Sequence, residues 1–562
     1  MSVSEKIIAT FFGDNEHPVE WKDEKEKSLM WFYDDLHCPN PISPLYFDIG
    51  GWWGSTCEYM YRRFGAPFGK EWIAKKIGGY VYSAIVPREP DADFASFGAY
   101  FGAEMPIYAD RFLDWWKDRY LPEILNNYKY MDEFDASKVT LPDYLIHMED
   151  CLDIQERHFR IHWILNLAQF SAGLGFRAAY QEAVGEIDEE NLGQIIVSDR
   201  DRNWDSLKAL WEIKEFIKVT PELTELIKKP TKEIIASISN TEKGKELSGK
   251  VVRYQKEYGY KAIYTHEYIY PTWIEDPSPI FDALRMYVAD DYNFYDAFNK
   301  CKEAQNAAIE ALYAKVSDPE KKTKLQESLE LAVRMAPLTP DHHFYIDQGC
   351  YARVRLMFIE LGKKLVAAGI LNDAEDIFML KYEEIRAISV RPDAFDSKAL
   401  VMKRRGEMEE AKKRTPKEWY GTISHWQLYE EPYKGLWGWP FKYETEVAAQ
   451  KEPQSKTVLK GLPASPGVVE GVARFVTSPS EFDQIEKGDI LICKMTNPAW
   501  VVSFSKISAL VTDTGGALSH PAVVSREFGI PCVVGTSKAT KIIRSGMKIR
   551  VDGSKGVVEI LN

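Results

Sequence analysis

Residues 509–535, ALVTDTGGALSHPAVVSREFGIPCVVG, constrain the fold more than any other part of this 562-residue chain. The apolar run Ala509–Val511 predicts a short strand, and the glycine pair after it predicts a turn, because glycine tolerates positive φ. Ser519 suits a helix N-cap and Pro521 the first helical turn. Gly529 predicts the end of that helix, ahead of a second apolar run. The stretch therefore predicts strand, turn, helix and strand in that order.

His520 falls at the N-terminus of the predicted helix, beside the glycine turn. Backbone N–H groups at such a position bind anions, and phosphate above all. A neutral imidazole there is a competent nucleophile toward a phosphoryl group, because its ordinary pKa is near ~6.5. Taken locally, a capping or packing histidine is the alternative. The residues predicted to bind the phosphate are Gly515, Gly516, Ser519 and Arg526.

The stretch resembles the signature of the phosphohistidine swivelling domain, the mobile domain of PEP-utilising enzymes. Phosphoenolpyruvate synthase, pyruvate phosphate dikinase and rifampin phosphotransferase contain this domain. The resemblance continues through GLPASPGVVEGVARFV at 461–476, KGDILICKMTNPAW at 487–500 and SGMKIRVDGSKGVVEIL at 545–561. It implies that His520 carries a phosphoryl group.

Apolar periodicity divides the chain into two regions. From about 105 to 440 apolar residues recur at helical spacing, whereas after 457 short β-rich runs alternate with turn signals. The polar segment YETEVAAQKEPQSKT at 443–457 has no apolar period and reads as a linker. We therefore expect a mainly α substrate-binding domain at 1–442, a flexible linker at 443–457 and a small α/β swivelling phosphohistidine domain at 458–562.

Composition excludes several classes of partner. The net charge of −14 argues against nucleic acid and against an anionic membrane surface. No apolar run approaches the ~18 residues of a membrane-spanning helix, and the N-terminus has no signal-peptide pattern. Seven cysteines without C-x-x-C pairs indicate free thiols and a cytoplasmic location.

A second cluster of titratable residues lies in PLTPDHHFYIDQGCYARVR at 337–355. We expect His342 or His343 to be the base for the phosphoryl acceptor, with Asp341 orienting it and Arg353 holding phosphoryl oxygens. Asp347 and Gln348 are predicted to line the substrate pocket. The alternative is a solvated helix face with a capping aspartate. The helix after this segment resembles the drug-binding domain of rifampin phosphotransferase.

Aromatic residues gather in the stretch WFYDDLHCPNPISPLYFDIGGWWGSTCEYMYR at 31–62. The proline and glycine residues of this stretch predict a loop. This loop is either an aromatic pocket wall or a surface loop fixed by buried aromatics. The pocket interpretation assigns Asp35, His37, Trp52 and Trp53 to the substrate site.

His158 and His162 are four residues apart on one predicted helix. They could chelate a metal, but no third ligand follows at a recognisable spacing, so packing is favoured and no metal is expected.

No segment reads as a nucleotide-binding ATP-grasp domain, and there is no G-x-x-x-x-G-K-[ST] loop. This layout resembles the His-domain subunit of phenylphosphate synthase. The resemblance implies a separate ATP-grasp subunit that uses ATP and Mg²⁺ to phosphorylate His520, with a small phenol-type hydroxyl as the acceptor. An antibiotic phosphotransferase similar to the rifampin enzyme and a non-enzymatic phosphocarrier or regulator are the alternatives.

Overall fold

A computed structural model describes residues 19–35, 37–51, 53–66, 69–89, 92–198, 200–289, 291–417, 419–421, 457–477, 479–496, 498–516 and 519–561. The chain divides into two compact units. Unit 1 comprises the described residues of Met1–Ser171, Tyr264–Tyr270 and Tyr345–Leu428, and unit 2 those of Ala172–Ile263, Pro271–Phe344 and Tyr429–Asn562. The predicted domain at 1–442 is thus distributed over both units. Within the described ranges, no helix combines the length and apolarity needed to cross a bilayer.

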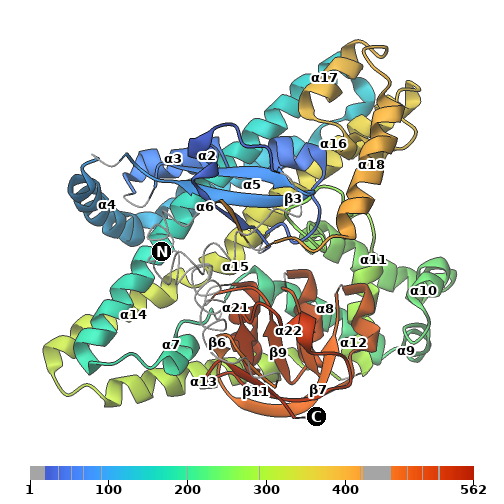
Figure 1. Ribbon diagram of the computed structural model, residues 1–562. Helices are drawn as coiled ribbons and strands as arrows, with labels where there is room; N and C mark the ends of the chain where they lie inside the picture. The colour runs from blue at the N-terminus through green and yellow to red at the C-terminus, as the bar shows by residue number, and fades with distance from the viewer. Residues whose placement is uncertain are drawn as a thin grey trace. The chain divides into compact units, whose positions relative to one another are not determined.

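Unit 1 is mainly helical (Figure 1). It also contains π-helical and 3₁₀ turns, which are named η here. Its first part contains α2 (Glu24–Lys27), η1 (Tyr46–Gly50), α3 (Ser55–Phe64), α4 (Phe94–Trp115), η2 (Trp116–Tyr120), α5 (Leu121–Glu133), η3 (Ala136–Lys138) and α6 (Leu141–Val184), which continues into unit 2. The later part contains the end of η5 (His343–Gln348), whose first two residues belong to unit 2, and then α16 (Gly349–Ala367), η6 (Ala374–Met379), α17 (Tyr382–Val390) and α18 (Ser397–Lys412).

Unit 1 also contains a four-stranded antiparallel sheet that the sequence analysis did not predict. Its order is β2-β3-β1-β4, with β1 at Met30–Tyr33, β2 at Glu71–Ile77, β3 at Tyr80–Val86 and β4 at Trp419–Gly421. A two-residue turn joins β2 to β3, and both turn glycines have positive φ (Gly78 60°, Gly79 96°). Such a turn between β-branched and aromatic runs is a hairpin signal. The expected loop at 31–62 was wrong in part, because it contains strand, π-helix and the helix α3.

Unit 2 begins with a helical part that follows the predicted periodicity closely. In α13 (Phe294–Ala314) the residues Cys301, Ala308 and Leu312 recur at helical spacing and are buried. The helices are α7 (Glu189–Ile195), α8 (Arg202–Lys218), α9 (Pro221–Leu226), α10 (Thr231–Ser237), η4 (Ile238–Asn240), α11 (Glu242–Tyr258), α12 (Ser278–Ala289), α13 (Phe294–Ala314), α14 (Pro319–Met335) and α15 (Leu338–His342).

The C-terminal part of unit 2 is the expected small α/β domain, built on an eight-stranded sheet (Figure 1). The strand order is β5-β12-β11-β7-β8-β9-β10-β6, and the central strands β7, β8, β9 and β10 are parallel. The strands are β5 (Val458–Lys460), β6 (Leu462–Ser465), β7 (Val468–Phe475), β8 (Ile490–Cys493), β9 (Ala509–Thr512), β10 (Cys532–Val534), β11 (Lys548–Asp552) and β12 (Val557–Ile560). The helical segments are η8 (Pro479–Gln484), η9 (Pro498–Ser505), α21 (His520–Phe528) and α22 (Ala539–Ile542).

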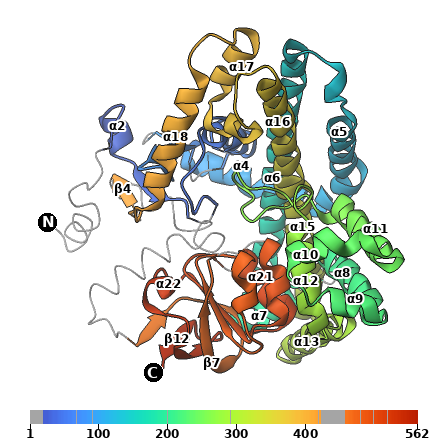
Figure 2. The same cartoon turned by 90° about the vertical axis from the view of Figure 1, so that its right-hand side faces the viewer.

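The two faces of this sheet are covered by different helices (Figure 2). Alternate residues of the central strands belong to different apolar clusters, because successive strand side chains point to opposite faces. Leu491 and Leu510 pack with Val524 of α21, whereas Ile490 and Val511 belong to the cluster that contains α22. Helix α21 is therefore held on one face by its own apolar stripe.

The apolar core on the α21 face of the sheet extends beyond the sheet domain. Its cluster continues into helices of the same unit, where Trp204 stacks on Phe528 with ring centroids 6.5 Å apart. Helix α21 packs on α13, and η9 packs on α12. The sheet domain is thus docked on the helical part of unit 2. The predicted linker at 443–457 lies outside the described residues apart from its last residue.

One buried histidine of unit 1 gives a pH-dependent prediction. His158 on α6 is fully buried, its Nε2 lies 3.2 Å from Asn127 Nδ2, and its Nδ1 has no hydrogen-bond partner in the described ranges. Burial, and then the charges of Arg157 and Arg353, lower the pKa of His158 to about 3. Its neighbour on the same helix, His162, lies 3.2 Å from Asp347 through its Nδ1.

When folding lowers the pKa of a histidine, the unfolded state binds its proton more readily than the folded state does. The free energy of unfolding therefore decreases as the pH falls from the unfolded pKa to the folded pKa. For His158 that interval runs from ~6.5 to about 3. We expect about 2 kcal/mol of stability to be lost through this residue between pH 7 and pH 5. The Tm of His158→Gln, measured by calorimetry, should therefore fall less than the parent's over this range. Parallel Tm curves for parent and variant would contradict the assignment.

Candidate functional site

His520 is the first residue of α21, as the sequence predicts. The helix ends at Gly529, which adopts the left-handed conformation expected of a terminating glycine. The imidazole is half-buried, and the Phe504 ring meets it edge-on at 6.4 Å. The positive end of the helix dipole and the first-turn N–H groups make this position favourable for an anion.

A threonine fixes the orientation of the His520 ring. Thr496 is buried, and its Oγ1 lies 2.9 Å from His520 Nδ1. When Nδ1 donates its proton to this hydroxyl, the lone pair of the neutral ring is on Nε2. Nε2 is buried and has no hydrogen-bond partner in the described part of the chain. The geometry therefore presents Nε2 as the reactive atom.

The electrostatic surroundings keep His520 neutral. Burial, and then the charge of His343 in the same unit, lower the pKa of His520 to about 3. The ring is therefore unprotonated, and so nucleophilic, throughout the neutral pH range. The electrostatic effect that disfavours an imidazolium at His520 has the sign that would attract a phosphoryl group attached to Nε2.

The glycine turn has a structural role that the sequence analysis assigned differently. Gly515 has φ +121°, and a Cβ there would lie 2.7 Å from Ser519 Oγ. Ser519 occupies the N-cap position, but its hydroxyl donates to the carbonyl of Gly516 at 2.7 Å instead of capping α21. Arg526, predicted to bind phosphate, lies in the last turn of α21 and donates to the carbonyl of Ala464. These residues shape the turn and fix the far end of the helix.

Residues 341–343 lie in unit 2 with His520. Asp341 accepts a hydrogen bond from the backbone N–H of Arg202, the first residue of α8, whose N-cap is Asp201. Burial raises its pKa to about 7. His342 is buried, and its Nδ1 lies 2.9 Å from the Leu338 carbonyl oxygen. The ring centroids of His342 and His343 are 4.1 Å apart. Of the two histidines predicted as bases, His343 is the one that acts electrostatically on His520.

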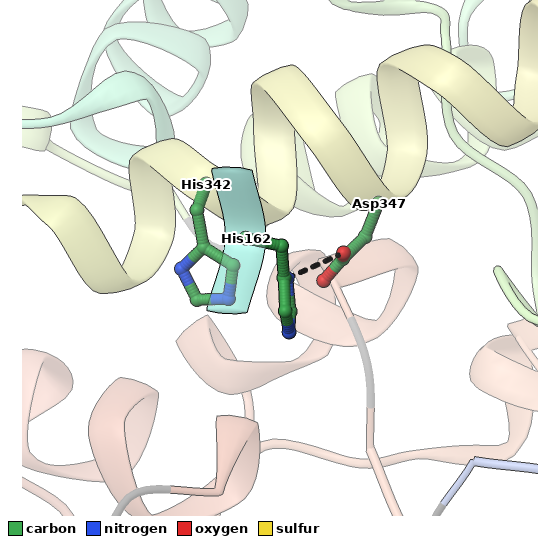
Figure 3. Close-up of side chains that lie close together, drawn as sticks. All are labelled: His162, His342 and Asp347. Carbon is green, nitrogen blue, oxygen red and sulfur yellow. Dashed lines mark ion pairs between the residues drawn. The ribbon is translucent and has the colours of Figure 1, made fainter. Parts of the chain in front are cut away.

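The remaining residues of the 337–355 cluster belong to unit 1. Arg353 makes a two-point ion pair with Asp132, with N···O distances of 2.8 and 2.9 Å, so its predicted contact with phosphoryl oxygens would require this pair to open. Asp347 and Gln348 are buried. Figure 3 shows Asp347 in an ion pair with His162 of α6, at 3.2 Å between Oδ1 and Nδ1; His342 precedes it on the same helical run.

In the aromatic loop at 31–62, His37 contacts an aspartate, but this residue is Asp34 and not the predicted Asp35. His37 Nδ1 lies 2.9 Å from Oδ1 of Asp34, whose side chain is fully buried. Asp35 is buried as well, and Trp53 packs on Tyr46 and Phe47. The predicted pocket residue Trp52 lies outside the described residues.

The comparisons with known proteins agree with this geometry. Residues 485–556 match the family model described as "PEP-utilising enzyme, mobile domain", and residues 171–339 match the "Rifampicin phosphotransferase fourth domain". The second match covers the helical part of unit 2 almost completely.

Similar proteins include phosphotransferases and phosphoenolpyruvate synthases. The chain is 27% identical to the "Uncharacterized phosphotransferase YvkC" of Bacillus subtilis over 95% of its own length and 62% of that protein. It is 25% identical to the rifampicin phosphotransferase of Bacillus cereus over 73% of its length and 46% of that enzyme. It is 47% identical to the phosphoenolpyruvate synthase of Pyrococcus furiosus over 20% of its length and 14% of that enzyme. The chain thus spans less than two thirds of these relatives.

The motif around His520, the fold of the sheet domain and these matches agree. Residues 485–556 therefore match the mobile domain of PEP-utilising enzymes, and the helical segment 171–339 matches the fourth domain of rifampicin phosphotransferase.

Proposed function

We propose that this chain is part of an ATP-dependent phosphotransferase, in which His520 carries the phosphoryl group to a hydroxyl of an aromatic, phenol-type acceptor. A separate ATP-grasp subunit, with ATP and Mg²⁺, phosphorylates His520. The single observation that supports this function best is the placement of an unprotonated His520 at a helix N-terminus, with Nδ1 held by Thr496.

In the transfer step the hydroxyl oxygen of the acceptor attacks phosphorus. The P–N bond to His520 breaks, its electron pair returns to Nε2, and a base takes the hydroxyl proton. His343 is proposed to stabilise the phosphoryl oxygens on His520, because its charge acts at that ring. A stabilising role replaces the base role that the sequence suggested for this residue.

A second candidate acceptor is a larger, rifampicin-type hydroxyl compound. The match of residues 171–339 to a rifampicin phosphotransferase domain, and the similarity to the Bacillus cereus enzyme, favour it. Comparing phenol and rifampicin as acceptors for the charged chain would distinguish the two.

Chemical phosphorylation tests the carrier function without the partner subunit. We expect phosphoramidate to label the full chain on Nε2 of His520, because Nδ1 is occupied by Thr496. ³¹P NMR distinguishes the two ring isomers of phosphohistidine. Thr496→Val should slow labelling and give a mixture of isomers, because the tautomer is no longer fixed. Labelling confined to other histidines, or to Nδ1 in the parent, would refute the proposal.

A further inference from the structure

The first turn of α8 contacts two segments of unit 2, and each of them carries a histidine of the proposed transfer. Helix α8 begins at Arg202, and Trp204 is its third residue. Trp204 packs against the carrier helix α21, which begins with His520, whereas Arg202 packs against the segment that contains His343. All of these residues belong to unit 2. One short stretch of backbone therefore links the two histidines.

On the carrier side, four aromatic rings form a continuous row from His520 to α8. The Phe504 ring lies 6.4 Å from the His520 ring and 5.6 Å from the Phe528 ring, measured between centroids. Phe528, the last residue of α21, stacks on Trp204 at 6.5 Å with an interplanar angle of 13°. Trp204 is buried, and the Phe298 ring contacts it edge-on at 5.2 Å. The row attaches the far end of α21 to the helical part of unit 2.

On the other side, Arg202 holds the two residues that flank the histidine pair in the sequence. Its backbone N–H donates to Oδ1 of Asp341 at 2.9 Å, and its guanidinium carbon lies 4.5 Å from the centre of the Phe344 ring. These contacts are a hydrogen bond to a carboxylate and a cation–π pair. Displacing the segment that contains His343 from α8 would therefore break both of them.

The electrostatics of His520 agree with this arrangement. Burial, and then the charge of His343, lower the pKa of His520 to about 3. The interaction between two charges weakens as the distance between them grows. The effect of His343 on His520 therefore depends on contacts that keep the carrier helix at α8.

We propose that the stack of Phe528 on Trp204 docks the carrier helix at α8 and positions His520 for transfer. Asp341 has the matching role on the segment that contains His343, through its bond to the backbone of α8. This inference rests on the proposed function, because the alignment matters for a phosphoryl group that leaves the carrier for an acceptor. Charging by a small reagent does not need this alignment. The docking contacts should therefore control discharge and leave charging unchanged.

The test uses the full chain charged with phosphoramidate, with phenol as the acceptor and ³¹P NMR to follow loss of phosphohistidine. Phe528→Ala should charge at the parent rate. Its discharge at saturating phenol should be slower by ~10-fold to ~10²-fold, since a displacement of about 1 Å is enough for such a loss. The phenol concentration that gives half the maximal rate should not change, because the docking contact does not bind the acceptor.

Three further variants separate docking from stability. Phe528→Leu keeps an apolar side chain but removes the ring, so it should discharge slowly even if Phe528→Ala does not fold. Phe528→Tyr keeps the ring and should recover most of the parent rate. Ile542→Ala is the matched control, because Ile542 is also partly buried but lies on α22, on the opposite face of the same sheet. It should charge and discharge as the parent does.

The Asp341 contact has its own pair of variants. Asp341→Ala removes the acceptor of the Arg202 N–H and should slow discharge. Asp341→Asn keeps an oxygen that can accept this bond and should recover most of the rate. A role that needs the charge of Asp341 would not be restored by asparagine.

The His520 ring provides a readout that does not depend on charging. In ¹³C-histidine-labelled protein, the Cε1–H signal missing from the His520→Gln spectrum identifies it. Its titration midpoint should move to higher pH in Phe528→Leu, because undocking reduces both burial and the effect of His343. The midpoint should stay unchanged in Ile542→Ala.

The possible outcomes distinguish the docking contact from the proposed function. Discharge within a few-fold of the parent in both Phe528→Leu and Asp341→Ala would overturn the inference and leave the proposed function intact. Equal losses of charging and discharge would also overturn it, because the substitutions would then be acting on the fold. If the charged parent discharges neither to phenol nor to rifampicin, the proposed function fails. An unchanged His520 midpoint in Phe528→Leu would then refute the docking contact separately.

Discussion

Replacing His520 by glutamine is expected to abolish phosphoryl transfer, by at least roughly four orders of magnitude, because no other group then forms the P–N intermediate. The fold should persist, since the half-buried ring makes one described hydrogen bond, to Thr496, and an edge contact with Phe504. An amide at this position can still bond the Thr496 hydroxyl. The measurement is incorporation of label from phosphoramidate, or from ATP once the partner is in hand.

The label in the parent should be lost in acid and stable in base, as a phosphoramidate bond is. Circular dichroism and the Tm of His520→Gln should match those of the parent, which separates loss of the nucleophile from loss of the fold. His147→Gln serves as the control for a histidine outside the site, because His147 lies on α6 and contacts Tyr130 and Phe134. Acid-labile label that persists in His520→Gln would place the carrier at another residue.

The C-terminal domain was predictable because its signals are local. Ala509–Val511, Pro521 and Gly529 each specify one element by a rule that acts within a few residues, and the structure confirms all three. Thr496 was missed as a functional residue although it lies in a recognised motif. Its role arises from the proximity of two loops 24 residues apart in sequence, which spacing along the chain does not reveal.

Unit 1 was less predictable because its sheet is assembled from distant segments. Strand β4 at 419–421 pairs with β1 at 30–33, so neither strand has its partner nearby in sequence. The hairpin of β2 and β3 did have a local signal in its two glycines, and helical periodicity elsewhere concealed it. The same explanation applies to Asp347 and His162, which are 185 positions apart.

Asp341 makes a contact that its position in the sequence did not indicate. An aspartate at the start of a predicted helix suggests a cap for that helix or an orienting partner for the next histidine. In the structure its carboxylate instead accepts from the N–H of Arg202, at the start of a helix 139 residues earlier. Local rules identify a carboxylate that can accept from a helix N-terminus, and only the tertiary structure identifies which N-terminus it contacts.

The second large effect is expected at His343, which is proposed to stabilise the phosphoryl group on His520. His343→Ala should slow transfer to the acceptor by ~10²–10³-fold, the usual cost of losing one donor to a developing charge. The pKa of His520 should rise from about 3 toward its ordinary value, because one of the two causes that lower it is removed. Phosphorylated His520 should accumulate, since charging does not require the acceptor.

Two further variants separate this role from that of a base. His343→Gln should recover part of the lost rate, because an amide still donates a hydrogen bond, whereas a general base would not be restored in this way. His342→Gln should have a smaller effect than His343→Ala, since the buried His342 ring has its Nδ1 2.9 Å from the Leu338 carbonyl oxygen. Equal losses in His343→Ala and His343→Gln would instead support the base role, and an unchanged His520 pKa would remove the electrostatic argument altogether.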